Sequence, residues 1–318
     1  MKTVLVTIPV NEKQRAQLES AAEGCHVTYI PASIISTEDI AKADAIVGNV
    51  PADLIHASER LTLLQLDSAG ADAYVKPGVL SKGTALCNST GAYSRSVAEH
   101  AVGQTLMLMK NLHLYRDTQF TGEWVDYGAV TSPVGATVLV VGLGDIGMQY
   151  ARIMKGMGAA VIGVKRRASA LPEGIDELVL TSEIDTVLPR ADIVFSVLPS
   201  TDATTHFFTE ERFRLMKKST YFINCGRGTV VDSDVLLHAL ENGEIAGAAI
   251  DVTDPEPLPA NHPLWRQRNM LITPHVAGGF RLPHTLECIV DIACKNLTHW
   301  RLNEEYQNVV DFETGYKR

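Results

Sequence analysis

Three residues in the second half of the chain could assist the reduction of a carbonyl group. Each follows a separate apolar run. Arg227 lies between two glycines in residues 224–228, Glu256 lies between two prolines in residues 251–258, and His275 follows Thr-Pro. A guanidinium can bind a carboxylate through two hydrogen bonds, and an imidazole can donate a proton near neutral pH. Each residue alone is more often structural. Together, at the ends of successive predicted strands, they form a usable set for carbonyl reduction.

A glycine-rich turn precedes these residues in the chain. Gly142, Gly144 and Gly147 have the spacing G-x-G-x-x-G at the end of the apolar run 136–141. Residues 148–157 are good helix formers without proline, and a second apolar run follows at 159–164. A strand that turns tightly into a helix presents free N–H groups and the positive end of the helix dipole to an anion. The pattern predicts a dinucleotide site; the alternative is a purely structural strand–turn–helix.

The residues that follow the second apolar run bear on the choice of cofactor. A carboxylate usually stands about 20 residues past the glycine turn where unphosphorylated NAD is bound. Here that position holds three cations, Lys165, Arg166 and Arg167. Such a cluster would complement a 2′-phosphate. We therefore expect a preference for NADP(H), with NAD(H) possible; the alternative is a solvated basic patch at a strand end.

Composition narrows the class of protein. The 318 residues suffice for two domains, and 46% hydrophobic with 20% charged residues is typical of a soluble globular protein. The net charge of −9 argues against a nucleic-acid surface. Five widely scattered cysteines without C-x-x-C predict reduced thiols in the cytoplasm and no metal site. No apolar stretch approaches the roughly 20 residues that span a bilayer, and the N-terminal run is better explained as a strand than as a signal peptide.

The elements that must position these residues alternate along the chain, which predicts parallel α/β sheets. In the first 95 residues we expect strands at 3–8, 26–30, 44–47, 61–66 and 84–88, with helices such as 12–22 and 52–59. Turn-rich segments 48–51 and 68–72 follow strands. They are candidate substrate loops or ordinary turns.

The remaining chain continues the alternation after a helical segment. Residues 96 to about 115 predict a helix that begins with a capping box, Ser96 with Glu99. A polar excursion over the surface or onto a partner subunit is expected to follow over 117–133. Further strands are expected at 160–164, 192–198, 221–224, 247–251 and 270–273. A final helix, 282–302, would pack back on the first domain.

The chain resembles the D-isomer-specific 2-hydroxyacid dehydrogenases, a family that includes glyoxylate/hydroxypyruvate reductases and phosphoglycerate dehydrogenases. The resemblance is carried by segments 68–72, 97–100, 142–147, 198–204, 224–228, 251–258 and 274–275. It implies two doubly wound parallel-sheet domains with a cleft between them, a Rossmann cofactor domain (96–284) and a flavodoxin-like substrate domain (1–95 plus 285–318). It also implies a homodimer.

The resemblance also implies roles for individual residues. His275 would be the general acid, Glu256 its partner and Arg227 the anchor of the substrate carboxylate, assisted by the backbone N–H groups of Ala69 and Gly70. Asp251 would hold the nicotinamide carboxamide. Cofactor contacts would extend from Gly142, Gly144, Gly147, Lys165, Arg166 and Arg167 to Asp145, Ile146, Pro199, Thr204, Cys225, Asp251 and Gly278.

The sequence leaves two questions open. One is whether the chain catalyses at all, because a catalytically silent, dinucleotide-sensing scaffold or co-repressor can share the fold; the complete set of three residues favours an enzyme. A formate-dehydrogenase-like activity is disfavoured, since formate oxidation needs no proton-donating histidine. The other is the substrate, and segments 110–111, 127–135 and 279–280, which depart from the family pattern, bear on it.

Overall fold

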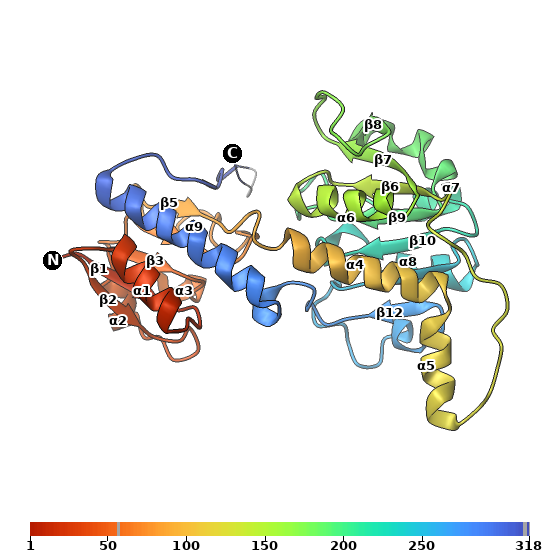
Figure 1. The fold of residues 1–318 in the computed structure, drawn as a ribbon, viewed down its shortest axis with the longest axis horizontal. Helices are drawn as coiled ribbons and strands as arrows, with labels where there is room; N and C mark the ends of the chain where they lie inside the picture. The colour runs from red at the N-terminus through yellow and green to blue at the C-terminus, as the bar shows by residue number, and fades with distance from the viewer. Residues whose placement is uncertain (56–57, 314–316, 318) are drawn as a thin grey trace. The chain divides into compact units, whose positions relative to one another are not determined.

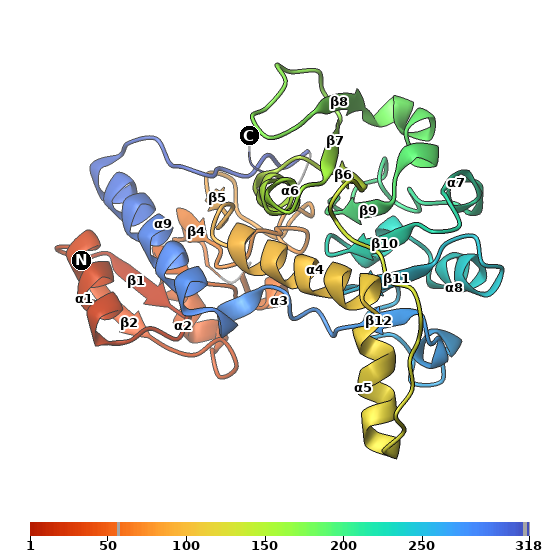
Figure 2. The same ribbon diagram turned by 45° about the vertical axis from the view of Figure 1, so that its right-hand side comes forward.

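The computed structural model describes residues 1–55, 58–313 and 317, and it contains two compact units (Figures 1 and 2). One unit combines Met1–Tyr93 with Gly279–Arg318, and the other is Ser94–Gly278. The predicted divisions, 95/96 and 284/285, fall close to these limits. The assignment of substrate and cofactor roles to the two units stays a prediction. Within the described residues, no helix is long and apolar enough to cross a membrane.

The first unit is built on a five-stranded parallel sheet in the order β2-β1-β3-β4-β5. This is the flavodoxin-like order, so the predicted fold of this unit is confirmed. Its strands are β1 (Thr3–Val6), β2 (His26–Tyr29), β3 (Ala45–Val47), β4 (Leu63–Gln65) and β5 (Ala85–Cys87). Each predicted strand is present, and each is shorter than expected.

Helices cover the sheet of the first unit. They are α1 (Glu12–Ala21), α2 (Thr37–Ala41), α3 (Ala52–Ile55) and α9 (Pro283–Leu302), with the short 3₁₀ turn η5 (Gly279–Arg281) before α9. Ile289, Val290 and Leu297 of α9 share one buried cluster with Val4 and Leu18. The prediction that the last helix returns to the first domain is therefore confirmed, and Figure 1 shows α9 (blue) beside α1 (red).

The second unit is built on a seven-stranded sheet in the order β12-β11-β10-β9-β6-β7-β8, with every pairing parallel. Counted along this unit, the order is that of a Rossmann fold with one added strand. Its strands are β6 (Thr137–Val141), β7 (Ala160–Lys165), β8 (Glu177–Leu180), β9 (Ile193–Ser196), β10 (Tyr221–Asn224), β11 (Gly247–Ile250) and β12 (Met270–Ile272). Strand β8 was not predicted, because a short edge strand gives only a weak pattern.

Figures 1 and 2 show α4 and α6 on one face of this sheet and α7 and α8 on the other. The helices are α4 (Ser94–Met109), α5 (Leu112–Thr121), α6 (Asp145–Gly156), α7 (Glu210–Leu215) and α8 (Ser233–Glu241). Short 3₁₀ turns are η1 (Thr181–Thr186), η2 (Leu188–Arg190), η3 (Gly228–Val230) and η4 (Pro263–Arg266).

One prediction about the segment 94–133 is wrong. Helix α4 begins at Ser94, so Ser96 lies inside its first turn and donates to the Ala277 carbonyl at 2.7 Å instead of capping the helix. Glu99 pairs with Arg95 at 2.8 Å. Asn111, with φ 55° in the left-handed region, ends this helix, and α5 runs to Thr121, into the start of the predicted excursion 117–133, most of which is exposed.

Candidate active site

The three residues of the predicted site leave the carboxyl ends of three neighbouring strands. Arg227 follows β10, Glu256 follows β11 and His275 follows β12. These strands are adjacent in the sheet, and parallel strands end at the same edge. In open α/β sheets ligands bind at that edge.

His275 and Glu256 form a direct pair. The Nδ1 atom of His275 lies 2.7 Å from Oε1 of Glu256, and the side chains are 50% and 43% exposed. A carboxylate that accepts at Nδ1 fixes this nitrogen as the N–H donor, which directs Nε2 to other partners. The pair therefore has the geometry of an imidazole oriented by a carboxylate.

The backbone of His275 has an uncommon conformation. Its φ is +51°, in the left-handed region that residues other than glycine rarely adopt, at a cost on the order of 1–3 kcal/mol. Its N–H donates to the Asp251 carbonyl oxygen at 2.7 Å. Such a conformation persists only where surrounding contacts determine it, so neighbouring residues must hold the loop of His275 in place.

Asp251 supplies most of those contacts. Its Oδ1 accepts from the Thr273 hydroxyl at 2.6 Å and from Val276 N–H at 2.9 Å, and Oδ2 accepts from Ala277 N–H at 2.9 Å. Asp251 is only 2% exposed. Three of its roughly four acceptor positions are thus taken by the loop that carries His275. The predicted contact of Asp251 with a nicotinamide carboxamide stays a prediction.

Arg227 is set by the glycines on either side. A Cβ at Gly226 would lie 2.4 Å from the Leu198 carbonyl oxygen, and one at Gly228 would lie 1.9 Å from that of Thr253. No side chain fits at either position, so the turn of Arg227 packs backbone to backbone against the segment that leads to Glu256. The half-buried guanidinium donates through Nη1 to the Gly226 carbonyl at 3.0 Å.

A cavity of about 290 Å³ lies beside the histidine–glutamate pair. Its lining combines polar groups, Asp251, Thr253, Glu256 and His275, with apolar ones, among them Leu258, Trp265 and Ile272. This half-apolar space, with a few convergent polar groups, is typical of a small-molecule site.

The glycine turn fits a dinucleotide. Gly142 has φ +105°, and a Cβ at Gly147 would lie 2.0 Å from the Gly142 carbonyl oxygen, so both positions require glycine. Gly144 caps α6 without a side-chain hydrogen bond, and nothing lies within 4 Å of a Cβ placed there. The amino end of α6 is therefore open to an anion. Asp145, exposed, and Ile146, partly buried, are the first residues of this helix.

The basic cluster lies at the end of β7. Arg166 and Arg167 are exposed, and Nζ of Lys165 donates to the Ser169 hydroxyl at 2.9 Å. Three cations next to a hydroxyl suit a phosphate group.

Some other residues predicted to contact the cofactor already form hydrogen bonds within the protein or are buried. The Thr204 hydroxyl donates to the Pro199 carbonyl at 2.5 Å and accepts from Thr201 N–H at 2.9 Å, so it shapes its own loop. Cys225 is 9% exposed, and Gly278, at the end of this unit, is partly buried.

The predicted substrate loop lies in the first unit, after β4. The Asn88 side chain donates to the Ala69 carbonyl at 2.7 Å, and the Ser68 hydroxyl donates to the Gly70 carbonyl at 2.6 Å. Within the described part of the chain, the backbone N–H groups of Ala69 and Gly70 donate to no protein acceptor. They are available to an anion. Burial raises the pKa of the nearby Asp67 carboxyl, which accepts from Asn49 N–H at 3.1 Å.

Sequence reasoning missed a polar cluster on α4. His100 and Gln104 both lie within hydrogen-bond distance of the Thr273 hydroxyl, at 3.1 and 3.2 Å. Their signal was available: two polar residues spaced by four on a helix lie on one face, here among the apolar residues Val97, Ala101 and Leu108.

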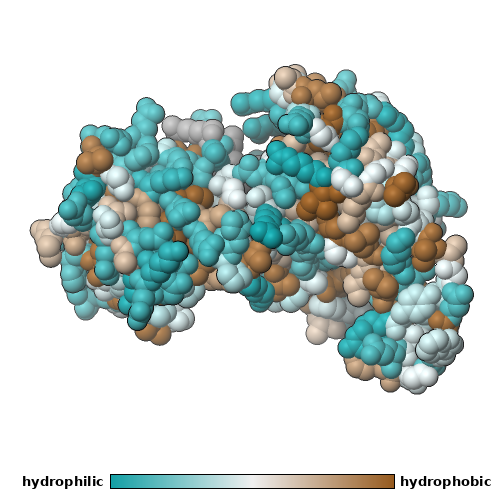
Figure 3. All heavy atoms as spheres, in the orientation of Figure 1, coloured by the Kyte–Doolittle hydropathy of each residue, from teal (hydrophilic) through white to brown (hydrophobic). Residues whose placement is uncertain are grey.

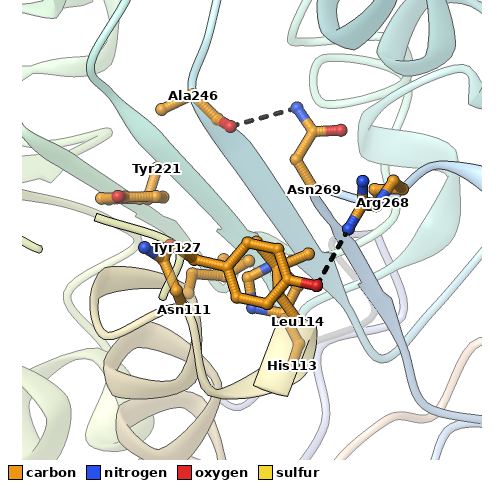
Figure 4. Close-up of a pocket in the computed structure, with 9 residues that line it drawn as sticks. Asn111, His113, Leu114, Tyr127, Tyr221, Ala246, Arg268 and Asn269 are labelled. Atoms are coloured by element: carbon orange, nitrogen blue, oxygen red, sulfur yellow. Dashed lines mark hydrogen bonds between the residues drawn. The ribbon is translucent and has the colours of Figure 1, made fainter. Parts of the chain in front are cut away.

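A second cavity, of about 280 Å³, lies at the opposite edge of the sheet (Figure 4). Tyr127, Tyr221, Arg268 and Asn269 contribute to its lining. The Tyr127 hydroxyl and the Arg268 guanidinium lie 3.3 Å apart across it. It contains none of the three predicted catalytic residues.

Known proteins share this architecture. A model of the NAD-binding domain of D-isomer specific 2-hydroxyacid dehydrogenases matches residues 102–277. A glyoxylate reductase from Thermofilum pendens is 33% identical over 259 residues, which cover 78% of this chain and 74% of that protein. A D-isomer specific 2-hydroxyacid dehydrogenase family protein from Aeromonas salmonicida superposes with a TM-score of 0.85 at 29% identity, covering 98% and 99% of the two chains.

A further solved structure is similar over the same length. An NADPH-dependent glyoxylate/hydroxypyruvate reductase from Sinorhizobium meliloti, in complex with NADP and sulfate, has a TM-score of 0.83 at 25% identity and covers 99% and 100% of the two chains. The matched domain, the relatives and the two sheets agree. The chain therefore belongs to the D-isomer specific 2-hydroxyacid dehydrogenases, oxidoreductases that use a nicotinamide dinucleotide.

Proposed function

We propose that this chain reduces small 2-oxo acids to D-2-hydroxy acids, with NADPH as the preferred cofactor. The observation that carries the proposal is the 2.7 Å contact between His275 Nδ1 and Glu256 Oε1 at the carboxyl edge of a dinucleotide-binding sheet. Glyoxylate and hydroxypyruvate are the first substrates to test, because the Thermofilum and Sinorhizobium relatives carry these names.

His275 is the general acid of the proposed reaction. When bound, NADPH supplies the hydride that reduces C2 of the substrate. His275 gives a proton from Nε2 to the oxygen on C2, and Glu256 stabilises the charged ring through Nδ1. In the oxidative direction the same nitrogen takes the proton back.

Arg227 is the proposed anchor of the substrate carboxylate. Its guanidinium can bind a carboxylate in a bidentate manner and polarise the neighbouring carbonyl group. In the first unit, the backbone N–H groups of Ala69 and Gly70, which donate to no acceptor within the described residues, are the proposed groups for binding an anion.

The preference for NADPH rests on the cluster Lys165, Arg166 and Arg167 at the end of β7. A carboxylate that would repel a 2′-phosphate is replaced by cations, and the Ser169 hydroxyl, which donates to the Ala170 carbonyl, accepts a hydrogen bond from Lys165. The Sinorhizobium relative in complex with NADP provides a precedent within the family.

The rival function is a catalytically silent, dinucleotide-sensing scaffold. A scaffold has no need for a carboxylate-oriented imidazole, and this pair is half exposed in a cavity rather than buried as a structural contact. The site therefore favours catalysis.

The test is a panel of 2-oxo acids, namely glyoxylate, hydroxypyruvate, pyruvate and bulkier branched or aromatic ones, each assayed with NADPH and with NADH at 340 nm. We expect turnover of at least one small acid, with higher kcat/KM for NADPH. NADPH binding without turnover of any acid would support the scaffold instead.

We also propose a homodimer. Large apolar side chains on and after α5 are exposed, including Leu112, Phe120 and Trp124, the last completely. In Figure 3 hydrophobic residues also gather over α4 and α6 of the same unit, where Leu106 and Met107 are only half-buried. Exposed apolar groups of this kind are typical of an interface. Sedimentation at micromolar concentration tests it, and a monomer would contradict it.

A further inference from the structure

A line of hydrogen bonds leads to the loop of His275. It begins at Cys225 and ends at Asp251, both predicted cofactor contacts, and Gln104 and Thr273 between them have no role in the proposed reaction. The Cys225 thiol lies 3.6 Å from Gln104 Oε1, and Gln104 Nε2 lies 3.2 Å from the Thr273 hydroxyl. The Thr273 hydroxyl lies 2.6 Å from Oδ1 of Asp251. Gln104 and Asp251 are 6% and 2% exposed.

The donors in this line all point the same way. Burial raises the pKa of the Cys225 thiol, so the thiol keeps its proton and donates to Gln104. The amide of Gln104 is thereby oriented with its NH₂ group toward Thr273. Thr273 has one hydroxyl proton, and its shortest contact is a carboxylate, which can only accept. The hydroxyl therefore donates to Asp251.

This direction fixes the role of His100. Its Nε2 lies 3.1 Å from the Thr273 oxygen, whose only proton is already directed to Asp251. Nε2 of His100 must therefore donate. The Thr273 hydroxyl then makes one donated and two accepted hydrogen bonds, which is its full capacity.

The line ends on the group that determines the backbone of His275. Asp251 binds the N–H groups of Val276 and Ala277 through its carboxylate, and its carbonyl oxygen accepts from His275 N–H. The Thr273 hydroxyl orients this carboxylate by donating to its Oδ1 atom. The Ser96 hydroxyl of α4 donates to the Ala277 carbonyl. Helix α4 and Asp251 thus enclose the loop 273–277 from two sides.

We propose that Thr273, supported by His100 and Gln104 of α4, is a positioning residue that holds the imidazole of His275 against Glu256. The inference rests on the proposed function, since these residues would position His275, the proton donor of the proposed reaction. An active-site group misplaced by about 1 Å can lose roughly a hundredfold in rate. Loss of the Thr273 hydroxyl lowers kcat and leaves the binding of NADPH in place.

The experiment compares Thr273→Val with Thr273→Ser. Valine has nearly the shape of threonine and lacks the hydroxyl, whereas serine retains it. We expect Thr273→Val to lower kcat by about ten- to a hundredfold with the Kd of NADPH changed by no more than about twofold, and Thr273→Ser to recover most of kcat. Gln104→Met, which removes one donor to Thr273, should give a smaller loss in the same direction.

The matched control is Thr220→Val. Thr220 is completely buried in the same unit, whereas Thr273 is partly buried, and the Thr220 hydroxyl donates to the Ala191 carbonyl at 2.8 Å, near the amino end of β10. Both valine variants lose the hydrogen bond that the threonine hydroxyl donates, and Thr273→Val also loses the two that its hydroxyl accepts, so a thermal melt of each variant is measured beside kcat. Only Thr273→Val should lose kcat.

A readout without substrate or cofactor separates this proposal from the proposed function. In the free wild-type protein the Nδ1 proton of His275, bound to Glu256, should give a downfield NMR signal that is absent from His275→Gln. We expect Thr273→Val to lose or broaden this signal and Thr220→Val to keep it. An unchanged signal and kcat in Thr273→Val, or a serine variant as impaired as the valine variant, would overturn the proposal. A wild-type protein inactive on every acid but with the expected NMR changes would refute the function alone.

Discussion

Nδ1 of His275 lies 2.7 Å from Oε1 of Glu256, although both side chains are about half exposed. An ion pair this exposed contributes only about 0–1 kcal/mol to stability. The contact therefore adds little to the stability of the fold. The protein nevertheless maintains it with a left-handed backbone at His275, which the buried carboxylate of Asp251 holds. The proposed role of His275 as proton donor requires such an arrangement.

Glu256→Gln tests this separation of stability from chemistry. Glutamine can still accept from Nδ1 but no longer stabilises a charged ring, so kcat should fall by about tenfold to a hundredfold. Because the pair is exposed, Tm should change little. The measurement is kcat at saturating NADPH beside a thermal melt. A large drop in Tm, or an unchanged kcat, would contradict the assignment.

Arg166→Gln and Arg167→Gln test the choice of cofactor. A charge-assisted hydrogen bond contributes about 1.5–3 kcal/mol, so each change should lower kcat/KM for NADPH by about tenfold or more. The value for NADH should stay within about twofold. Lys218→Gln, an exposed cation in the loop before β10, is the control for overall charge. Equal losses with both cofactors would remove the cluster from the 2′-phosphate site.

Gly144→Ala and Gly147→Ala test two different functions of the glycine turn. A methyl group at Gly147 meets a carbonyl oxygen at 2.0 Å, so the variant should lose about 1–3 kcal/mol of stability and also bind NADPH poorly. Nothing in the protein lies within 4 Å of a methyl group at Gly144. That variant should keep its stability and lose NADPH affinity by about tenfold, because the methyl group occupies the approach of the pyrophosphate.

The control for the glycine variants is Gly156→Ala. Gly156 is the last residue of α6, and a Cβ there has open space, so alanine should change NADPH affinity by less than about twofold. The comparison uses fluorescence titration with NADPH and thermal melts. If Gly144→Ala binds NADPH as tightly as Gly156→Ala does, the turn is not a pyrophosphate site.

Thiol reactivity should follow burial. Burial raises the pKa of Cys87 to about 12 and that of Cys225 further, and only the thiolate reacts. At pH 8 both should resist a thiol reagent in the native protein for hours, and all five cysteines should react after unfolding in urea. Mass mapping of the labelled peptides identifies the sites. Rapid labelling of Cys225 would show that the line through Gln104 is open to solvent.

The fold was readable from the sequence because apolar runs and turn residues recur at the spacing of α/β units. Every strand predicted in the first 95 residues exists, and the residues 221–224 form a strand with the expected bounds. What failed depended on tertiary contacts. Ser96 has the pattern of a helix cap, but the loop of Ala277 offers its hydroxyl a better acceptor and the helix starts two residues earlier.

The set Arg227, Glu256 and His275 could be predicted from the sequence because each residue follows a predicted strand, and the family resemblance implied the pairing of His275 with Glu256. The role of Asp251 as the clamp of the His275 loop could not. It depends on the left-handed turn at His275, which brings the N–H groups of Val276 and Ala277 to one carboxylate. No spacing rule predicts a left-handed histidine, since residues other than glycine avoid this conformation.

The most direct test of the account is His275→Gln, assayed with the best 2-oxo acid of the panel and NADPH. General acid catalysis contributes about a hundredfold to ten-thousandfold, so we expect kcat to fall by at least about a hundredfold while the Kd of NADPH stays within about twofold. A His275→Gln protein that binds NADPH and retains near-normal kcat would contradict the assignment of the proton donor.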